Sequence, residues 1–355
     1  MKISHVGTCN TGNAGDIALY HLTQKLFEKF LGRQKFSNIN IHKLITAKEV
    51  ATFNAAEFVL IGGGGVFLKD TKANANSGWF WNCPLPCLCK IKSPLIVFGV
   101  GYNRFRGQEE FDPIFRKHIN AITRRAVFFG LRNNGSVGKI KGYLNKNEKF
   151  HERLCMQPCP TTLLAKFYKT KKVKKRKVMA VNIAEDRKAL RKVGIKLYNS
   201  VVNVAKYAIK KGFAIEIVSH CPADRDEIVD IFKKNKVKHK IVKLEYAKVG
   251  TIIRYYKSIS LAIGMRGHSQ MIPFGVSTPF YSLISHDKLR YFLNDINCSW
   301  GAEISDANLE SKIISHIDLV VENPKSIVSK INNERNRLWS ITQANFVKIK
   351  ELLNA

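Results

Sequence analysis

Residues 259–275 read ISLAIGMRGHSQMIPFG and join an apolar run to two polar side chains. The run at 259–263 predicts a buried strand, so Arg266 and His268 are expected just beyond its carboxyl end. Open α/β sheets bind their ligands at this edge. A fixed cation and an imidazole two residues apart can hold an anion and move a proton, although local carbonyl groups could equally satisfy both side chains.

A glycine-bearing loop lies near the amino terminus. Residues 7–16 read GTCNTGNAGD, between a predicted strand at 3–6 and a predicted helix that begins near Ile17. Glycines let a ligand approach the backbone closely, and the following helix directs its positive end toward the loop. The loop lacks the G-x-G-x-x-G fingerprint and the Gly-Lys-Ser/Thr ending, which disfavours NAD and ATP. Alternatively, the loop is only a tight turn in which Asp16 caps the helix.

Four consecutive glycines, Gly62, Gly63, Gly64 and Gly65, follow an apolar run at 58–61. Ordering four glycines costs backbone entropy, so they are best explained where side chains would collide with a ligand or with a neighbouring strand. We expect them to form the wall of a cleft. A further apolar run at 95–98 opens onto glycines in the same way, at 99–101.

Taken in order, these motifs resemble the polysaccharide pyruvyl transferase family. The resemblance covers most of the chain, and it adds Asp70 after the glycine cluster, Arg132 with Ser136, and Lys288 after a predicted strand at 278–283. Each motif is weak alone, and their order and spacing carry the resemblance. Gly267 and the segment QMIPF at 270–274 depart from the family's usual pattern, which bears on acceptor preference more than on fold.

The resemblance implies an α/β fold of GT-B type, with two Rossmann-like domains facing across a cleft. The segment 169–177, KTKKVKKRK, is too charged to be buried and predicts a linker between domains. Alternating strands and helices after it indicate a parallel sheet; the strands are expected at 178–183, 214–219 and 260–264, and the helices at 196–211 and 224–235. We therefore expect domains at 1–170 and 178–323, and a helical tail at 324–355 that packs back on the first domain.

The chain carries a formal net charge of +32, with 59 Lys and Arg against 27 Asp and Glu. Such a surface attracts anions over a Debye length of ~8 Å at physiological salt. No recognisable nucleic-acid module is present, and the lysines are spread over many segments, which disfavours nucleic acid as a partner. We expect contact with an anionic membrane, at a lipid-linked oligosaccharide acceptor.

The sequence has no secretory signal and no apolar run near the about 20 residues of a membrane span, which predicts a cytoplasmic protein, peripheral at the inner face of the membrane. Its thiols are then expected to be reduced. Cys83, Cys87 and Cys89 lack a fourth ligand at the usual spacing, so no metal is expected. The nearby Trp79 and Trp81 could form a sugar-binding platform or an ordinary packed loop.

The resemblance further implies phosphoenolpyruvate as the donor, no cofactor, and a product in which pyruvate bridges two hydroxyls of one sugar as a cyclic ketal, in surface polysaccharide or exopolysaccharide biosynthesis. Arg132, Arg266 and Lys288 would clamp the donor, and His268 would be the general acid. Asp16 would orient or deprotonate an acceptor hydroxyl. The remaining candidates line the cleft or contact the acceptor: Gly12, Asn13, Gly15, the glycines at 62–65, Asn10, Asp70, Trp79 and Trp81.

Two other functions remain open from the sequence. In a nucleotide-sugar glycosyltransferase of the GT-B type, Arg266, His268 and Lys288 would neutralise a diphosphate. A non-catalytic glycan-binding protein would keep the cleft without the chemistry.

Overall fold

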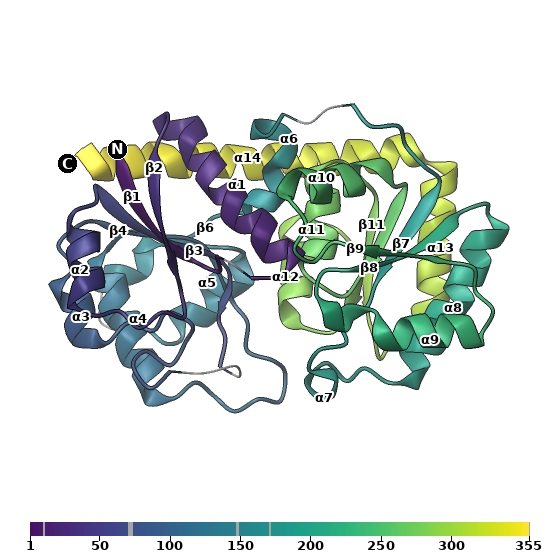
Figure 1. Cartoon of the computed structure of the whole chain (residues 1–355), viewed down its shortest axis with the longest axis horizontal. Coiled ribbons are helices and arrows are strands. Elements are labelled where there is room, and N and C mark those ends of the chain that lie inside the picture. The colour runs from purple at the N-terminus through teal and green to yellow at the C-terminus, as the bar shows by residue number, and fades with distance from the viewer. Residues whose placement is uncertain (10, 70–73, 147–148, 170–171, 355) are drawn as a thin grey trace. The chain divides into compact units, whose positions relative to one another are not determined.

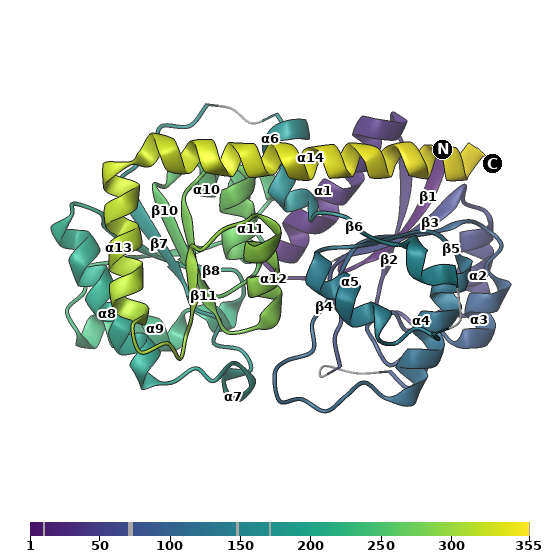
Figure 2. The same cartoon turned by 180° about the vertical axis from the view of Figure 1, so that it is seen from behind.

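The structure is a computed structural model that describes residues 1–354 apart from 10, 70–73, 147–148 and 170–171. The chain forms two compact units, which are described separately (Figures 1 and 2). The first unit contains residues 1–11, 19–160 and 338–355, and the second contains residues 12–18 and 161–337. Each unit is built on a six-stranded sheet whose strand pairs are all parallel, which confirms the predicted α/β class.

The strands of the first unit are β1 (Lys2–Gly7), β2 (Lys35–Asn40), β3 (Phe58–Phe67), β4 (Leu95–Tyr102), β5 (Ala126–Leu131) and β6 (Leu154–Met156). They lie in the order β2-β1-β3-β4-β5-β6. The helices that contribute to this unit are α1 (Ala14–Leu31), α2 (Ala47–Asn54), α3 (Leu85–Lys90), α4 (Pro113–Arg125), α5 (Asn134–Lys141) and α14 (Pro324–Asn354). The first residues of α1 and the residues of α14 before Leu338 belong to the second unit.

The two faces of the first sheet are covered by different helices. On one face, side chains from α2 to α5 form a core with the strands; Phe53, Phe115 and Val97 are among its members. On the other face, Phe27 of α1, Phe98 of β4 and Phe346 of α14 form an aromatic cluster, with ring centroids between 4.9 and 5.5 Å apart. The carboxyl-terminal half of α14 is therefore part of the first unit's core (Figure 2).

The four glycines at 62–65 lie inside β3, a central strand. A methyl group on Gly62 would overlap the carbonyl oxygen of Phe98 on β4, and one on Gly65 would press on the Asn103 side chain. Close approach of the neighbouring strand accounts for the first of these glycines, which is one of the two reasons that the sequence suggested. Whether the segment also forms a wall of a ligand cleft stays a prediction.

The second unit begins with a short helix and then alternates strands with helices. Its strands are β7 (Val178–Asn182), β8 (Ala214–Ser219), β9 (Lys240–Lys243), β10 (Leu261–Gly264), β11 (Phe280–Ile284) and β12 (Gly301–Glu303). Its helices are α6 (Leu164–Phe167), α7 (Lys188–Arg191), α8 (Ile195–Lys210), α9 (Asp226–Lys234), α10 (Val249–Ser258), α11 (His268–Gly275), α12 (Asp287–Asp295) and α13 (Leu309–Glu322). Helix α8 shows why they pack: Leu197, Val201, Val204 and Ala208 recur every three or four residues and are buried.

The second sheet has the order β12-β11-β10-β7-β8-β9, so the chain winds outward in both directions from β7 and β10. The strand order reverses between these two strands, which pair in register from Met179 with Leu261 to Asn182 with Gly264. Ligands of open α/β sheets bind at such a switch point, beyond the carboxyl ends of the strands. The topology therefore directs attention to the loops that follow β7 and β10.

The division between the units differs from the predicted linker at 169–177. The second unit already begins at Thr161, because the segment that includes α6 packs on α11, where a methyl group on Gly275 would overlap the Thr161 carbonyl. The charged segment is also tied to this unit, since the Lys175 ammonium donates to the Ile259 carbonyl (2.8 Å) and the Arg176 guanidinium to the Glu216 carboxylate (2.6 Å). The high charge of the segment 169–177 was therefore not sufficient to locate the boundary between the two units.

Candidate functional site

Arg266 lies at the switch point of the second sheet and is bound by two carboxylates. It follows β10 by two residues, and its Nε donates to both carboxylate oxygens of Asp224, at 2.6 and 2.9 Å. Its Nη2 donates to Asp186, which follows β7, at 2.6 Å. No described residue accepts a hydrogen bond from its Nη1. Arg266 thus joins the loops that follow three neighbouring strands.

Asp224 is the buried anchor of this arrangement. It has no exposed surface and ends a short 3-10 turn, Pro222–Asp224, that follows β8. Its Oδ2 also accepts hydrogen bonds from the Asn182 side chain (3.2 Å) and from the backbone N–H groups of His220 (3.0 Å) and Cys221 (3.2 Å). A buried carboxylate that is itself held by several donors fixes the Arg266 guanidinium in one orientation.

The charges around Asp186 are dominated by cations. Burial alone would raise the pKa of Asp186, but Arg266, Arg191, Arg187 and Lys288 outweigh it and hold the pKa at about 2. Burial would likewise lower the pKa of Arg266, and the carboxylates of Asp224 and Asp186 raise it instead. Four cations thus lie around Asp186. Such a local concentration of positive charge can attract an anionic ligand.

Residues 12–18, the second half of the glycine loop and the start of α1, are part of the second unit. Asn13 caps α1, because its side-chain oxygen accepts from the backbone N–H groups of Gly15 (2.8 Å) and Asp16 (3.2 Å). The helix therefore begins earlier than predicted, and Asn13 takes the capping role considered for Asp16. The Asn13 amide donates to the Cys221 sulfur (2.9 Å), and the Ala14 N–H donates to the His220 carbonyl (3.0 Å).

His268 begins α11 and is packed against this loop. A methyl group on Gly15 would overlap the His268 imidazole at its Nδ1 side, so only glycine fits there. The histidine is 8 % exposed. A similar close approach joins β10 to α11, where a methyl group on Gly264 would overlap the Ser269 hydroxyl. The loop and the histidine, 253 residues apart in the chain, therefore form one surface of the second unit.

Two further side chains in this region lie in unusual environments. The Gln270 amide, in the first turn of α11, is fully buried and no described group hydrogen-bonds to either of its polar atoms. Tyr246 is the opposite case, because 74 % of its surface is exposed. Its backbone has a positive φ of 59°, its N–H donates to the Gly12 carbonyl (3.1 Å), and its ring covers Gly12 so closely that a methyl group there would overlap it.

The structure brings some of the predicted site residues together within the second unit. These are Gly12, Asn13, Gly15, Asp16, Arg266, His268 and Lys288. Sequence reasoning missed Asp186, Asp224, Cys221 and Tyr246. The only available signal was positional, since Asp186 and Asp224 follow the carboxyl ends of parallel strands.

The other predicted site residues lie in the first unit. Arg132 is 5 % exposed and its guanidinium covers Gly101, where a methyl group would press on it. Its part in a site with Arg266 stays a prediction. Trp79 and Trp81 have no exposed surface and belong to the core on the α2–α5 face, which corrects the expectation of a sugar platform. Trp79 also donates from Nε1 to Nδ1 of His118 (3.0 Å). Asn10 and Asp70 lie outside the described residues.

Two kinds of feature are absent from the residues that the structure describes. Their His, Cys, Asp and Glu side chains form no group of three or more that could hold a metal ion. Among their helices, none combines the length and the apolar character needed to cross a membrane.

The two parallel sheets define an α/β protein of the GT-B fold class. Three solved structures show this likeness over nearly the whole chain. UDP-GlcNAc 2-epimerase from Neisseria meningitidis bound to UDP-GlcNAc is 12 % identical, with 100 % of both chains covered and a TM-score of 0.58. A glycosyltransferase from Rickettsia africae is 11 % identical, covering 99 % of this chain and 97 % of its own, with a TM-score of 0.57. The S. aureus MnaA–UDP co-structure is 13 % identical, covering 93 % and 90 %, with a TM-score of 0.54.

Sequence comparison is more specific than fold. Residues 13–287 match the family described as polysaccharide pyruvyl transferase, which is more than three quarters of the chain. The chain therefore belongs to the polysaccharide pyruvyl transferase family, as its motifs indicated. No curated protein matches it in sequence.

Proposed function

We propose that this protein transfers pyruvate from phosphoenolpyruvate to a sugar, as a cyclic ketal, in the biosynthesis of a surface polysaccharide. The observation that carries the proposal is the set of four cations around Asp186, at the switch point of the second sheet and on the same unit as His268 and the second half of the glycine loop. Phosphoenolpyruvate carries its phosphate ester and its carboxylate on the same carbon atom, and both groups need cationic partners to bind in one site.

The reaction needs an acid and a site for the leaving phosphate. A proton is added to the methylene carbon of phosphoenolpyruvate, and one sugar hydroxyl adds to the neighbouring carbon and loses its proton. The bond from that carbon to the phosphate oxygen then breaks, phosphate leaves, and the second hydroxyl takes its place and loses its proton. Pyruvate ends as a ketal on two oxygens of one sugar, with inorganic phosphate as the other product.

Each step has a candidate residue. His268 supplies the proton, and a bound phosphate near it would favour its protonated form. Lys288 and the Nη1 group of Arg266 bind the donor, while the other nitrogens of Arg266 are held by Asp186 and Asp224. Asp16, in the first turn of α1, orients or deprotonates an acceptor hydroxyl. Arg132 is a further candidate for donor binding.

The acceptor side of the site has an aromatic candidate that the sequence did not suggest. Tyr246 covers Gly12 and leaves most of its ring exposed. Sugars stack their apolar C–H faces on such rings. A non-glycine residue held in the left-handed region is uncommon and persists where the surrounding structure fixes it, which favours a functional position for Tyr246.

The charge of the whole chain suits an acceptor at a membrane surface. With a net charge of +32, a cytoplasmic protein is attracted to the anionic inner leaflet, where a lipid-linked oligosaccharide acceptor would be available. No metal or other cofactor has a part in this proposal. Nucleic acid has none either.

The test is donor binding followed by turnover. Isothermal titration of the protein with phosphoenolpyruvate, and separately with a panel of UDP-sugars, distinguishes the candidate functions. We expect phosphoenolpyruvate to bind, and phosphate release to require both phosphoenolpyruvate and a saccharide acceptor. Binding of a UDP-sugar in place of phosphoenolpyruvate would instead support the glycosyltransferase function. UDP-sugars are included because the similar Neisseria epimerase is bound to UDP-GlcNAc. Binding of neither donor would support a non-catalytic glycan-binding protein.

A further inference from the structure

The starts of the strands in the first sheet carry a row of cations. The six strands are parallel, so they all begin along one edge of the sheet, the amino edge. Five of the six strands begin with a lysine or arginine or follow one within three residues: Lys2 (β1), Lys35 (β2), Lys92 (β4), Arg125 (β5) and Arg153 (β6). The exception is β3, which Glu57 precedes. At a strand spacing of ~4.8 Å, the row extends about 24 Å from β2 to β6.

The cations of this row are accessible to a partner. Four of the five are exposed, and Arg125 is half-buried. Between residues that the structure describes, the ion pairs of the first unit involve other cations: Lys25, Lys43, Lys69 and Arg104. A row of exposed cations that are not neutralised by neighbouring carboxylates attracts an anionic partner.

A cavity of about 480 Å³ lies in the amino edge, between the starts of β5 and β6 and the last turns of α14. Four cations line it, Arg124, Arg125, Arg153 and Lys348, against one carboxylate, that of Glu152. The Arg153 Nη1 donates to the Arg124 carbonyl at the end of α4 (2.9 Å), which holds the guanidinium at the cavity without neutralising its charge. The cavity is therefore a basic hollow within a basic edge.

Apolar side chains are exposed beside these cations. Leu352, which lines the cavity, is 42 % exposed, and Val347 on the same helix is 56 % exposed. Lys348 and Leu352 are four residues apart and so lie on one face of α14. Figure 2 shows this end of α14 at the end of the unit where β1 begins. Exposed apolar side chains beside lysine and arginine are typical of segments that lie in the interface of a membrane.

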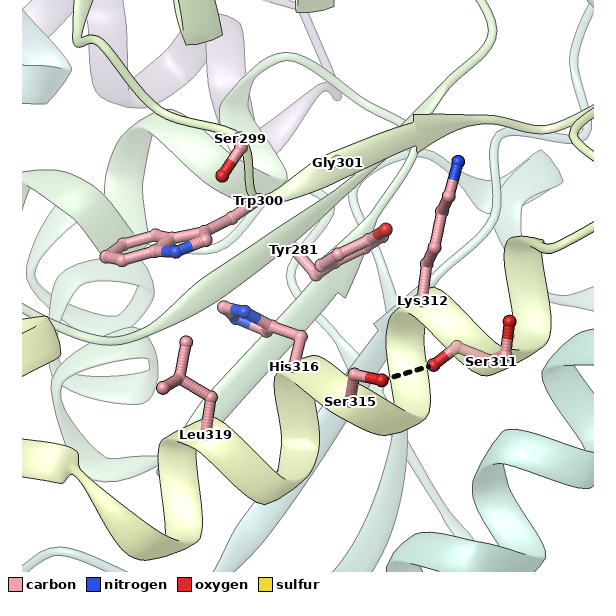
Figure 3. Close-up of a pocket in the computed structure, with 9 residues that line it drawn as sticks. All are labelled: Tyr281, Ser299, Trp300, Gly301, Ser311, Lys312, Ser315, His316 and Leu319. Carbon is pink, nitrogen blue, oxygen red and sulfur yellow. Dashed lines mark hydrogen bonds between the residues drawn. The ribbon is translucent and has the colours of Figure 1, made fainter.

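The hollow that Figure 3 shows in the second unit lacks these properties. It lies between α13 and β12, and its ring-bearing side chains Tyr281, Trp300 and His316 are buried. Its cation, Lys312, is paired with the Asp306 carboxylate at 2.5 Å. Accessible cations and accessible apolar surface therefore coincide at the amino edge of the first sheet and not at this hollow.

The amino edge is separate from the predicted donor-binding residue of the first unit. Arg132 follows the carboxyl end of β5, whereas the cavity lies at the start of that strand, roughly 20 Å away along its length. Ligands of open parallel sheets bind beyond the carboxyl ends of the strands. The cations of the opposite edge therefore call for a partner other than the donor.

We propose that the amino edge of the first sheet, with the cavity at Arg153 and Lys348, is the surface through which the protein docks on an anionic phospholipid membrane. The cavity takes the phosphate of a lipid headgroup, and Leu352 and Val347 reach the boundary with the acyl chains. A long row of cations matches a charged bilayer surface, whereas a single small anion needs only one cluster. This surface gives the membrane contact of the proposed function a place in the fold, and it rests on that proposed contact but not on the donor or the reaction.

The experiment measures sedimentation of the full-length protein with vesicles, in the absence of donor and acceptor. The vesicles are phosphatidylcholine with and without about one third phosphatidylglycerol. Lys35→Glu/Lys348→Glu reverses one charge near each end of the row. Lys196→Glu/Lys206→Glu is the matched control, because both lysines are exposed on α8 of the second unit and the net charge changes by the same amount.

We expect binding to the anionic vesicles only, and weaker binding when added salt shortens the Debye length from ~10 to ~3 Å. Lys35→Glu/Lys348→Glu should weaken vesicle binding by about twentyfold or more, since one basic residue near an anionic surface contributes about fivefold. The control should change it by less than about threefold, because distant charges are screened. Melting temperatures of both variants should match that of the wild type.

A second pair of variants tests the apolar contribution. Leu352→Ser should weaken binding to the anionic vesicles by about threefold or more, because binding in the interface scales with the apolar area that is buried. Leu319→Ser is the control, since Leu319 is 39 % exposed on α13 of the second unit and should leave binding unchanged.

Equal losses of vesicle binding in the two double variants would overturn the proposal, because net charge alone would then explain the attraction. Binding of polyglutamate or single-stranded DNA without binding of anionic vesicles would overturn it in favour of a soluble polyanion. Phosphate release from phosphoenolpyruvate with a water-soluble saccharide acceptor should be unchanged in Lys35→Glu/Lys348→Glu. A wild-type protein that binds anionic vesicles but does not turn over phosphoenolpyruvate would contradict the proposed function and support the docking surface.

Discussion

At the scale of single residues, Arg266, which the sequence indicated as a donor-binding cation, depends on two carboxylates that the sequence did not indicate. Arg266 is held by Asp224 and Asp186, and the first of these has no exposed surface. Without these carboxylates, a buried guanidinium would be costly in a region that contains three other cations. The carboxylates therefore make it possible for several cations to share one site.

Replacement of Asp224 tests this dependence. Asp224→Asn leaves the Arg266 charge without its main partner, so we expect the free energy of unfolding to fall by about 3 kcal/mol or more. Denaturant titration measures the change. Asp230→Asn is the control, since Asp230 is exposed on α9 of the same unit and only its 3.8 Å contact with Lys233 is lost. Equal effects of the two variants would contradict the anchoring role.

His268 is expected to act in the chemistry and not only in packing. His268→Gln should lower turnover by roughly 10²-fold, the usual scale for a general acid, while the donor still binds. Single-turnover assays with phosphoenolpyruvate measure the rate, and calorimetry measures the fold. His239→Gln, which changes a half-buried histidine elsewhere in the second unit, should leave turnover unchanged. Retained turnover per folded molecule, with a lower melting temperature, would assign His268 to packing alone.

Tyr246 is expected to affect the acceptor and not the donor. Tyr246→Ala removes an exposed ring and should raise the KM for the saccharide acceptor roughly 3- to 10-fold, because stacking on one ring contributes on this scale. The KM for phosphoenolpyruvate should not change, and Tyr246→Phe should behave as the wild type. Ile241→Ala, at a partly exposed position on β9, is the control. An equal rise in both KM values after Tyr246→Ala would point to a general loss of structure.

At the scale of elements, the start of α1 is joined to the second unit by several contacts. Asn13 hydrogen-bonds to Cys221, Ala14 to His220, and Gly15 packs on His268. The amino-terminal strand of the same segment belongs to the other sheet. Gly15 of this loop is therefore explained by contact with a histidine 253 residues later in the chain, and not by a turn alone.

A pair of glycine substitutions tests that contact. Gly15→Ala puts a methyl group into the His268 imidazole, so the loop or the histidine must move, and we expect turnover to fall at least tenfold. Gly250→Ala is the control, because a methyl group on Gly250 meets no atom within 4 Å. Alanine also favours the helix α10 in which Gly250 lies, so this variant should be neutral or more stable. Normal activity of Gly15→Ala would show that the contact between Gly15 and His268 is not needed for catalysis.

At the scale of the whole molecule, buried neutral histidines couple stability to pH in both units. Burial lowers the pKa values of His5, His118, His220 and His316 to about 4, from 6.5 in the unfolded chain. Between these values the unfolded chain binds more protons, so the free energy of unfolding falls as the pH drops from 6.5 toward 4. Above pH 6.5 these groups are neutral in both states and contribute no pH dependence.

His118 gives the clearest single case. Its Nδ1 accepts from the Trp79 indole and its Nε2 donates to the Cys83 carbonyl, so a second proton would face the indole N–H. In His118→Gln the loss of stability between pH 6.5 and about 4 should be shallower than in the wild type, as measured by denaturant titration at several pH values. Phe115→Leu, a core change without a titrating group, should lower stability without altering the slope. An unchanged slope in His118→Gln would falsify this account.

Much of the fold could be predicted from local pattern. The strand expected at 214–219 is β8 residue for residue, and the expected helix at 196–211 differs from α8 by one residue at each end. The Trp79 and Trp81 platform was wrong because exposure depends on distant partners, here the core on the α2–α5 face. The division between the units at Thr161 differs from the linker predicted at 169–177, since Lys175 and Arg176 hydrogen-bond to Ile259 and Glu216 of the second unit.

By itself, the sequence determined the alternation of apolar runs with glycine loops, and through it the α/β class and the family. These properties follow from residue type and local spacing, which act before any tertiary contact is made. Only the tertiary structure decided what surrounds the catalytic candidates. Asp186 and Asp224 precede Arg266 by 80 and 42 residues, and residues 12–18 reach His268 across most of the chain. Sheet order, which pairs β7 with β10, brings the carboxylates to Arg266, and no short stretch of sequence encodes that pairing.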